Sequence, residues 1–378
     1  MTLKDKLKQA RTKPKPKRPV WKGPEVDGVT QSLLSRFLVC RERFRVLVVE
    51  GLRPADQFNH RIEYGNMWHV CEEHFSSEGL GWEYCLKEYC QGLCQEYSFQ
   101  QIQIRHWFNV CKVQFPIYVD YWAKHSDEKH CTPLLQEQAF NVPYELPSGR
   151  VVRLRGKWDG VDLLGRGRSA GIFLGENKTK GDLKEDQITR QLQFDLQTML
   201  YLVGLQESLA DYAENGSDGF NNLPDQNVFG EKGVSGISYN CVRRPLSGGK
   251  GSIRQHKATG KKPAETEEHF YQRLGGIIAE DPGYFFMRWK VEVTSMDIER
   301  FKREFLTPIL EGLCDWWEWI GIHEDPFDGA SVNPIHWRTP FGFYNVLAEG
   351  GSSELDEYLG SGSELGLERT DNLFRELE

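Results

Sequence analysis

Two carboxylates and a lysine occupy a short glycine-punctuated stretch in the middle of the chain. Residues 151–164 alternate in polarity and are rich in Val and Leu, and residues 171–177 form a second such run. The glycines between them predict a turn, so the two runs are expected to pair as a β-hairpin. If the hairpin folds about its midpoint near Arg168, Asp159 and Glu176 lie nearly opposite one another, with Cβ atoms within ~5 Å.

The chemistry expected of this hairpin is the binding of a hard cation. Lys178 is two residues from Glu176, and side chains two apart on a strand project from the same face. Asp159, Glu176 and Lys178 are therefore predicted to share one surface, where paired carboxylates suit a divalent metal ion. Asp162, three residues beyond Asp159, is expected on the opposite face unless a bulge intervenes, and is the lesser candidate.

Composition limits the class of protein. The chain has 378 residues, of which 39% are hydrophobic and 12% aromatic, so it has enough apolar residues for a substantial globular core. It contains no apolar run long enough for a membrane span and no signal-peptide pattern at its start. The nine cysteines show no disulfide frame and suit a reducing compartment, so a cytoplasmic protein is expected. Cys85, Cys90 and Cys94 are interpreted as buried thiols, since ligand cysteines usually occur in C-x-x-C pairs.

Charge is concentrated at the two ends. The net charge is −8, but residues 1–23 carry nine Lys or Arg against one Asp, and residues 349–378 carry nine acids against two Arg. Both ends are typical of solvated tails. We therefore expect a basic flexible arm (1–24), one domain (25–348, with its core at 134–245) and an acidic flexible tail (349–378). The arm could contact a phosphate backbone or serve only as a solubilising leader.

The periodicity of apolar residues predicts the remaining elements. Helices are expected at Thr30–Leu52 (with Thr30 or Ser32 as cap), Tyr64–Gly79, 82–125 (one or two helices), Asp182–Ala210, Thr266–Ala279 and Ser295–Ile320, and strands at Leu134–Tyr144, Val234–Arg244 and Phe285–Val293.

Several side chains on these elements indicate a function only when they are considered as one set. His69 by itself is more often structural than a ligand, and Gln197 and Tyr201, one helical turn apart, would ordinarily mark an exposed face. In chain order, however, His69 is followed by G-x-x-D at 156–159, E-x-K at 176–178 and Q-x-x-x-Y at 197–201. This ordered set, on a helix, two strands and a helix, resembles the PD-(D/E)XK nuclease superfamily, and within it the RecB-like exonuclease branch with its phage and CRISPR-associated types.

The resemblance implies a fold and an activity. The fold would be α/β, a restriction-endonuclease-like mixed sheet flanked by helices, with additional N- and C-terminal helices. The activity would be metal-dependent hydrolysis of DNA phosphodiester bonds in recombination or repair, more exonucleolytic than site-specific, in a bacterial or phage-infected cell. A recombination partner protein is possible. No G-x-x-x-x-G-K-[ST] loop is present, so no ATP motor is expected in the chain.

Roles for individual residues also follow from the resemblance. Asp159 and Glu176 would bind Mg²⁺ or Mn²⁺, with the backbone carbonyl of Asn177 as a further ligand. His69 would be a ligand or an orienting group. Lys178 would orient the attacking water and stabilise the charge that builds up on the phosphate.

Contacts with DNA are expected from two places. By the same resemblance, Gln197 and Tyr201 would contact the nucleic acid beside the scissile phosphate. Independently, the glycine-rich loop 245–263 contains Lys250, Arg254 and Lys257, which could track a nucleic-acid strand or simply be solvated.

One feature of the branch is missing. Some RecB-like exonucleases hold an iron–sulfur cluster with one early and three late cysteines. Cys40 matches the early position, but the late segment Asn333–Leu347 contains no cysteine. We therefore predict no iron–sulfur cluster, a buried Cys40, and aromatic packing from residues 337–344 in place of the cluster.

Three other functions remain open. A non-catalytic nucleic-acid-binding module could keep this fold, although it would not need the acid–acid–lysine set. A structure-specific endonuclease would use the same site. A hydrolase of small phosphate substrates would need a closed pocket, which the long basic loop does not favour.

Overall fold

The fold is described from a computed structural model. It describes residues 20–54, 58–78, 81–124, 130–166, 170–181, 192, 195–215, 233–246, 253–260, 263–322, 367–370, 372–374 and 377. The predictions for Lys250, for residues 337–344, for most of the first part of the expected helix Asp182–Ala210 and for most of the two tails lie outside these residues.

The described elements follow the predicted order with few exceptions. The helices are α2 (Gln31–Val39), α3 (Arg41–Phe44), a π-helical turn (Arg45–Val49), α4 (His60–Glu78), α5 (Trp82–Glu96), a 3₁₀ turn (Ser98–Gln100), α6 (Gln101–Lys124), α8 (Leu196–Asn215), α10 (Glu267–Glu280), α11 (Pro282–Phe285), α12 (Ser295–Phe301), a second π-helical turn (Lys302–Leu306) and α13 (Thr307–Ile322). The strands are β1 (Leu52–Pro54), β2 (Cys131–Glu145), β3 (Val151–Leu164), β4 (Gly171–Lys180), β5 (Val234–Arg243), β6 (Phe286–Glu292) and β7 (Leu367–Arg369).

Five strands form one mixed sheet in the order β2-β3-β4-β5-β6. All neighbours are antiparallel except β4 and β5, which are parallel and are joined by a crossover that includes α8. β4 runs three residues beyond the predicted strand because its last residues pair with β5, where Lys180 faces Arg243. The α/β class, the mixed sheet and the additional N- and C-terminal helices are therefore confirmed.

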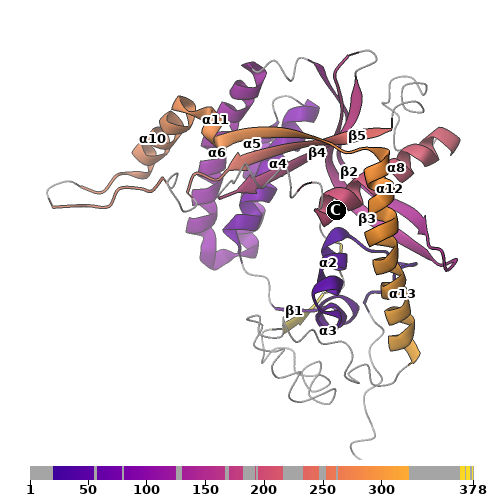
Figure 1. The fold of residues 1–378 in the computed structure, drawn as a ribbon. Helices are drawn as coiled ribbons and strands as arrows, with labels where there is room; N and C mark the ends of the chain where they lie inside the picture. The colour runs from indigo at the N-terminus through magenta and orange to yellow at the C-terminus, as the bar shows by residue number, and fades with distance from the viewer. Residues whose placement is uncertain are drawn as a thin grey trace, which may run out of the picture.

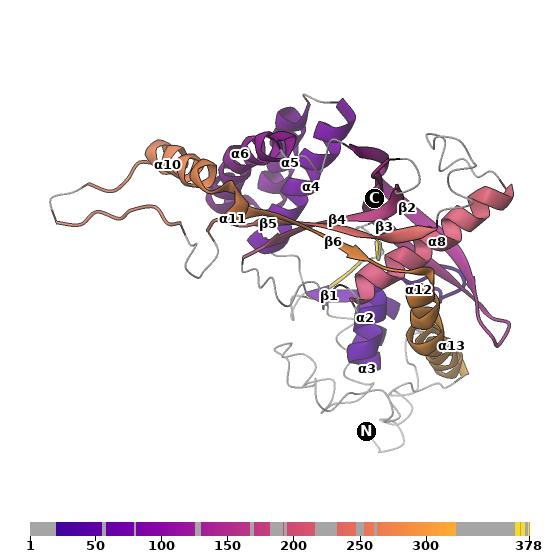
Figure 2. The same ribbon diagram turned by 45° about the horizontal axis from the view of Figure 1, so that its top comes forward.

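Helices cover the two faces of the sheet and give two hydrophobic cores. One core joins the sheet to α2, α8, α12 and α13, and the other joins it to α4, α5, α6 and α10. Figures 1 and 2 show these two groups of helices on opposite sides of the strands. Because both faces are covered, the strands bury apolar side chains on both sides, as is typical of sheets in α/β proteins.

The predicted helix at Thr30–Leu52 is interrupted. Thr30 caps α2 as expected, accepting a hydrogen bond from the backbone N–H of Leu33. The helix ends at Cys40, whose backbone is extended (φ −165°, ψ 118°). The Cys40 thiol is only partly buried, so the predicted burial was wrong. Cys90 is buried as expected, whereas Cys85 and Cys94 are only partly buried.

Aromatic rings join the N-terminal helices to α13. Trp21 packs edge-on against Phe44 and Trp317, with ring centroids 5.2 and 4.9 Å apart. Phe37 packs in the same way against Trp316, at 5.6 Å. Edge-to-face pairs of this kind add about 0.5–1.5 kcal/mol each beyond burial. The described ends of the domain are therefore held together by apolar contacts.

Short strands connect the two ends of the chain again. β1 and β7 pair antiparallel, and the backbone N–H of Thr370 donates to the carbonyl of Gly51 at 2.8 Å. Leu373, within the segment expected to be a tail, is buried. The division into arm, domain and tail stays a prediction.

Among the described helices, none has the length and apolarity needed to cross a bilayer.

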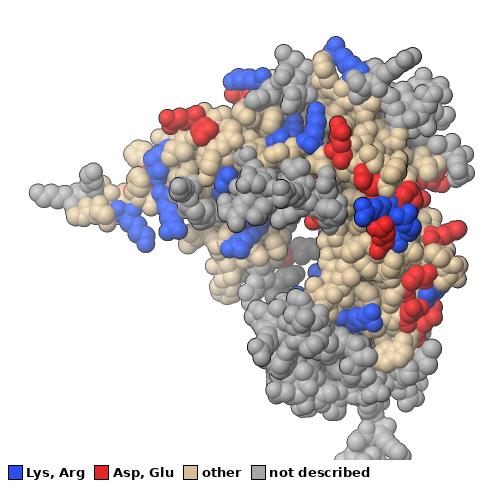
Figure 3. Space-filling model, viewed as in Figure 1, with Lys and Arg blue, Asp and Glu red and all other residues tan. Residues whose placement is uncertain are grey.

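The described residues 253–260 and 263–266, between β5 and α10, form an arm that projects from the body beyond α10 (Figures 1 and 2). In its described part, the backbone N–H of Glu265 donates to the carbonyl of His256 at 2.9 Å, which holds the two sides of the arm together. Figure 3 shows Lys and Arg side chains toward this side of the molecule, whereas Asp and Glu are more frequent over α12 and α13. The exposed charge is therefore unevenly distributed on this face.

Gly156 of the G-x-x-D motif is needed for packing. A Cβ atom there would lie 2.5 Å from the Phe140 ring and 2.8 Å from the Tyr201 ring, and Phe140 cannot move easily because it stacks on Trp158 at 4.6 Å. We expect Gly156→Ala to lower the free energy of unfolding by about 1–3 kcal/mol. Urea denaturation checks this.

The control for that measurement is Gly276→Ala in α10. A Cβ at Gly276 meets nothing within 4 Å, so alanine should stabilise the helix by about 0.5–1 kcal/mol. Equal stability of the Gly156→Ala and wild-type proteins would show that the close packing around this glycine is not required.

Candidate metal centre

The hairpin has the predicted register. Gly160 pairs with Gly175, which places Asp159 beside Glu176 at the next position. Backbone pairing of β3 with β4 ends at Gly160 and Gly175, and beyond this pair the two strands are joined through the Asp159 side chain. The backbone N–H of Asn177 donates to Asp159 Oδ2 at 2.7 Å. The Asp159 carboxylate is therefore held against the strand that carries Glu176.

Glu176 is buried, with 1% of its side chain exposed. Its Oε1 atom accepts a hydrogen bond from Gln197 Nε2 at 2.7 Å and forms an ion pair with Lys178 Nζ. Its Oε2 atom is buried and has no hydrogen-bond partner among the described residues. Burial raises the pKa of Glu176 to about 7, although Lys178 opposes the shift; the nearby charge of Asp159 adds to it.

A second group of ligand types adjoins Asp159. His69 Nδ1 lies 3.2 Å from Glu137 Oε1 and 3.8 Å from Asp159 Oδ1. The potential ligand atoms of these three residues all lie within 4.8 Å of one another. Burial alone would lower the pKa of His69, but the Asp159 charge and the hydrogen bond with Glu137 raise it to about 9. We call His69, Glu137, Asp159, Glu176 and Lys178 together the carboxylate site.

Glu137 was not among the residues predicted for the site. Its side chain is 9% exposed and bonds to both His69 and Lys157, the latter at 3.0 Å. Its φ of +47° is unusual for a residue with a Cβ, a strain that is found most often at functional sites. Glu137 lies opposite Asp159, because Gln136 pairs with Gly160 and Gln138 with Trp158.

The sequence does contain a signal for Glu137. The turn between β2 and β3 is closed by a hydrogen bond from Leu146 N–H to the carbonyl of Arg150, with Ser148 at its centre. Folding the chain symmetrically about Ser148 places Glu137 opposite Asp159, by the same reasoning that places Glu176 there. The P-S-G motif at 147–149 is a recognisable turn, so this pairing could have been predicted.

The α8 residues support the site from the other side. Gln197 reaches Glu176 directly, as described above. Tyr201 is partly buried, and its backbone carbonyl accepts a hydrogen bond from Trp158 Nε1 at 3.2 Å. Burial raises the pKa of Tyr201, so its phenol stays protonated at neutral pH. Contact of Gln197 and Tyr201 with nucleic acid stays a prediction.

The predicted basic-loop residues are not part of the carboxylate site. Arg254 and Lys257 are exposed on the projecting arm, whereas the acids lie on strands of the central sheet (Figure 1). Any contact they make with DNA would therefore lie away from the carboxylates.

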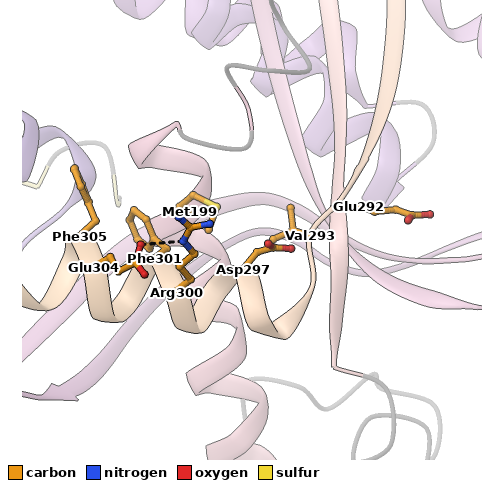
Figure 4. A pocket seen from close by; sticks show the side chains of 8 residues that line it. All are labelled: Met199, Glu292, Val293, Asp297, Arg300, Phe301, Glu304 and Phe305. Atoms are coloured by element: carbon orange, nitrogen blue, oxygen red, sulfur yellow. Dashed lines mark hydrogen bonds and ion pairs between the residues drawn. The ribbon is translucent and has the colours of Figure 1, made fainter.

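A separate apolar pocket of about 340 Å³ lies between α8 and α12. Met199, Val293 and Phe301 line it, and an ion pair between Arg300 and Glu304 crosses its edge (Figure 4). It contains none of the residues of the carboxylate site, so it adds nothing to the chemistry proposed there.

The carboxylate site fits a hard divalent cation. Its carboxylate oxygens are the ligands that Mg²⁺ and Mn²⁺ prefer, and the imidazole of His69 lies beside them as a further ligand or an orienting group. Asp159 Oδ1 and His69 face one another, and the unpartnered Oε2 of buried Glu176 lacks the hydrogen bond that a buried carboxylate oxygen normally has. A cation would satisfy this atom.

Comparison with protein families agrees with this geometry. Residues 29–284 match the PD-(D/E)XK nuclease superfamily model, which is more than half of the chain, and the five-strand mixed sheet is consistent with that fold. The chain belongs to the PD-(D/E)XK nuclease superfamily. The match does not resolve a branch within it. No curated protein matches the sequence.

The carboxylate site should make stability depend on pH. In the metal-free protein the pKa values of Glu176 and His69 are both raised, to about 7 and about 9. The folded state therefore holds more protons than the unfolded state. The free energy of unfolding falls as pH rises from about 4.5 to about 7 because of Glu176, and from about 6.5 to about 9 because of His69. Metal ligands must be deprotonated, so metal affinity rises over the same range.

We therefore expect the difference in Tm between protein in excess MgCl₂ and protein in EDTA to widen between about pH 6 and pH 9. Thermal denaturation at a series of pH values measures this difference. A difference that stays constant with pH would contradict the assignment of Glu176 and His69 to the metal centre.

Proposed function

We propose that this chain is a Mg²⁺- or Mn²⁺-dependent deoxyribonuclease that digests DNA from its ends, as in the RecB-like branch that its motifs resemble. One observation carries the proposal. Glu176 and Lys178 form an ion pair beside Asp159, and one buried oxygen of Glu176 has no partner among the described residues. A module that only binds nucleic acid would have no need for a buried carboxylate and a lysine in this arrangement.

Lys178 acts as a positive charge and not as a base. Burial would lower the pKa of its ammonium group, but Glu176 and Asp159 raise it well above the usual range. The group therefore stays protonated at neutral pH. It can donate hydrogen bonds to a phosphate oxygen and to an attacking water, and it offsets the negative charge that grows on the phosphorus centre.

The acids and the imidazole supply the ligand set. Asp159 and Glu176 would hold the cation, with His69 as ligand or orienting group and the Asn177 carbonyl as a further oxygen. A bound divalent cation supplies Lewis-acid chemistry, polarising the phosphate and making water more acidic. Gln197 holds Glu176 in one orientation, and Glu137 does the same for His69.

Action on DNA ends is the mode we favour over structure-specific endonuclease activity. The preference rests on the resemblance of the ordered motifs to RecB-like exonucleases. DNA recombination or repair, with or without a partner protein, is the process that this mode suits.

Digestion of linear and covalently closed circular DNA, with MgCl₂, MnCl₂ or EDTA, tests the proposal. We expect linear DNA to be degraded in either metal, circular DNA to stay intact, and EDTA to stop the reaction. Nicking of circles would indicate an endonuclease. Metal-independent binding without cleavage would indicate the non-catalytic module.

A further inference from the structure

A second cavity adjoins the carboxylate site on the face of the sheet that α4 and α6 cover. It has a volume of about 360 Å³. It begins at Asp159 and Asn177 and reaches Arg288 and Lys290 on the edge strand β6, with Trp122 of α6 in its wall. The cavity therefore connects the metal centre with two cations that the E-x-K motif does not include.

The strand register explains the floor of this cavity. Asn177 pairs with Asn240, and Asn240 pairs with Arg288, so three polar side chains form a row across β4, β5 and β6. The neighbouring row begins at Gly160 and Gly175.

That second row continues through Ser238 to Lys290. Its two glycines have no side chains. A Cβ atom at Gly175 would lie 3.3 Å from the backbone carbonyl oxygen of Gly160, which is a tight contact. The floor of the cavity therefore has no side chains at the two glycines beside Asp159, and polar side chains toward β6.

Asn240 presents an unused acceptor to the cavity. The residue is 4% exposed, and its Nδ2 atom donates to Tyr118 Oη at 2.6 Å and to Asn177 Oδ1 at 2.8 Å. These two bonds use both hydrogens of the amide. Its Oδ1 atom is buried and has no hydrogen-bond partner among the described residues. Leaving a buried acceptor unsatisfied is unfavourable, so a ligand that donates a hydrogen bond would gain affinity there.

The far end of the cavity suits a phosphate group. The Arg288 guanidinium lies over the Trp122 ring, 4.0 Å from its centroid, and Lys290 follows two residues later and is exposed. The planar guanidinium group can stack on an aromatic ring and recognise phosphate through its fork of N–H donors.

Three acids also line the cavity. Asp159 and Asp162 lie toward the other end, where the proposed cation would compensate their charge; the register shift between Pro133 and Leu135, opposite Asp162, is the bulge that lets both acids line one cavity. Burial raises the pKa of the third acid, Glu72, although the charge of Arg288 opposes the shift, so this carboxyl is less readily ionised and opposes a phosphate less than an exposed one would.

We propose that this cavity binds the terminal nucleotide of the strand being digested. Its phosphate would contact Arg288 and Lys290, its base or sugar would donate to Asn240 Oδ1, and the scissile bond would lie at Asp159. The volume is at the lower end for small-ligand pockets, which suits one nucleotide and excludes a duplex. The inference rests on the proposed nuclease function and specifies its substrate as a single-stranded end.

Nucleotide binding tests this directly. Deoxythymidine 5′-monophosphate and 3′-monophosphate are titrated separately into the full-length protein by calorimetry, in CaCl₂. We expect one of them to bind the wild type, which identifies the end that is held. Arg288→Gln and Lys290→Glu should each weaken this binding at least ~10-fold, since each removes a phosphate contact. Lys290 is exposed, so its variant should fold normally even if the Arg288 variant does not. The matched control is Arg303→Gln, an exposed arginine on the opposite side of the sheet.

Kinetics on a single-stranded oligonucleotide separate this proposal from the nuclease proposal. With Lys290→Glu we expect KM to rise about 10-fold while kcat stays within about twofold of wild type, and the salt dependence of binding to decrease. Unchanged nucleotide binding and unchanged KM in both variants would overturn the subsite while leaving the nuclease intact. A wild-type protein that cleaves no DNA would overturn the nuclease function, whatever it binds. Binding of neither monophosphate by an active wild-type enzyme would also overturn the subsite.

Discussion

Replacing Lys178 by alanine is expected to lower kcat for DNA cleavage by roughly 10²–10³-fold, the usual cost of losing one group that stabilises charge in a transition state. The ammonium group is positioned by an ion pair with Glu176 and kept charged by Glu176 and Asp159. It is not a metal ligand. Metal affinity should therefore fall little, and the loss should lie in kcat.

Lys180→Ala is the matched control for this variant. Lys180 is two residues further along β4, on the same face of the strand, and its Nζ lies over the Tyr239 ring at 5.4 Å. Because it does not contact the carboxylate site, its removal should change kcat by less than about threefold. Full cleavage by the Lys178→Ala protein, or an equal loss in both variants, would contradict the role proposed for Lys178.

Replacing Glu176 by glutamine should abolish both cleavage and the stabilisation by metal. The substitution keeps the shape of the side chain and its place beside Gln197, but it removes the charge and replaces one of the two potential metal-ligand oxygens by an amide nitrogen. In the wild type, metal at 100 times its Kd would add about 2.7 kcal/mol to the free energy of unfolding. In Glu176→Gln we expect most of this gain to disappear, as measured by urea denaturation with and without MgCl₂.

A suitable control is Glu207→Gln, which removes a carboxylate ten residues beyond Gln197 on α8, where it pairs with Lys302. This ion pair is partly buried and contains no residue of the carboxylate site, so its contribution to stability should be independent of metal. Stabilisation by MgCl₂ should therefore be unchanged in Glu207→Gln. Undiminished stabilisation in Glu176→Gln would mean that the cation binds elsewhere.

Elements that depend on residues close together in the sequence, such as the β3–β4 hairpin, could be predicted from the sequence. The β3–β4 register was obtained from the position of a glycine-rich turn, because a hairpin pairs residues symmetrically about its turn. By contrast, the helix at Thr30–Leu52 was expected to be continuous, and the break at Cys40 has no glycine or proline to mark it. The pairing of β1 with β7 joins segments more than 300 residues apart, and no local pattern indicates it.

The same distinction applies to the site. Asp159, Glu176 and Lys178 belong to one hairpin, so their proximity could be predicted, and Gln197 was expected beside them from the resemblance. Glu137 is not part of the ordered motifs; it reaches the site through a second hairpin, which turns at Ser148 and places it opposite Asp159. Arg288 and Asn240 could not have been found, because their position depends on the order of strands across the sheet.

The location of the bound cation tests the account most directly. Crystals of the full-length protein grown with MnCl₂ would show the ion by anomalous scattering. We predict one strong peak about 2 Å from carboxylate oxygens of both Asp159 and Glu176, with His69 Nδ1 or Nε2 beside it. A peak bound only by other residues, or no peak at this position in crystals of active protein, would contradict the metal centre on which the proposed nuclease chemistry depends.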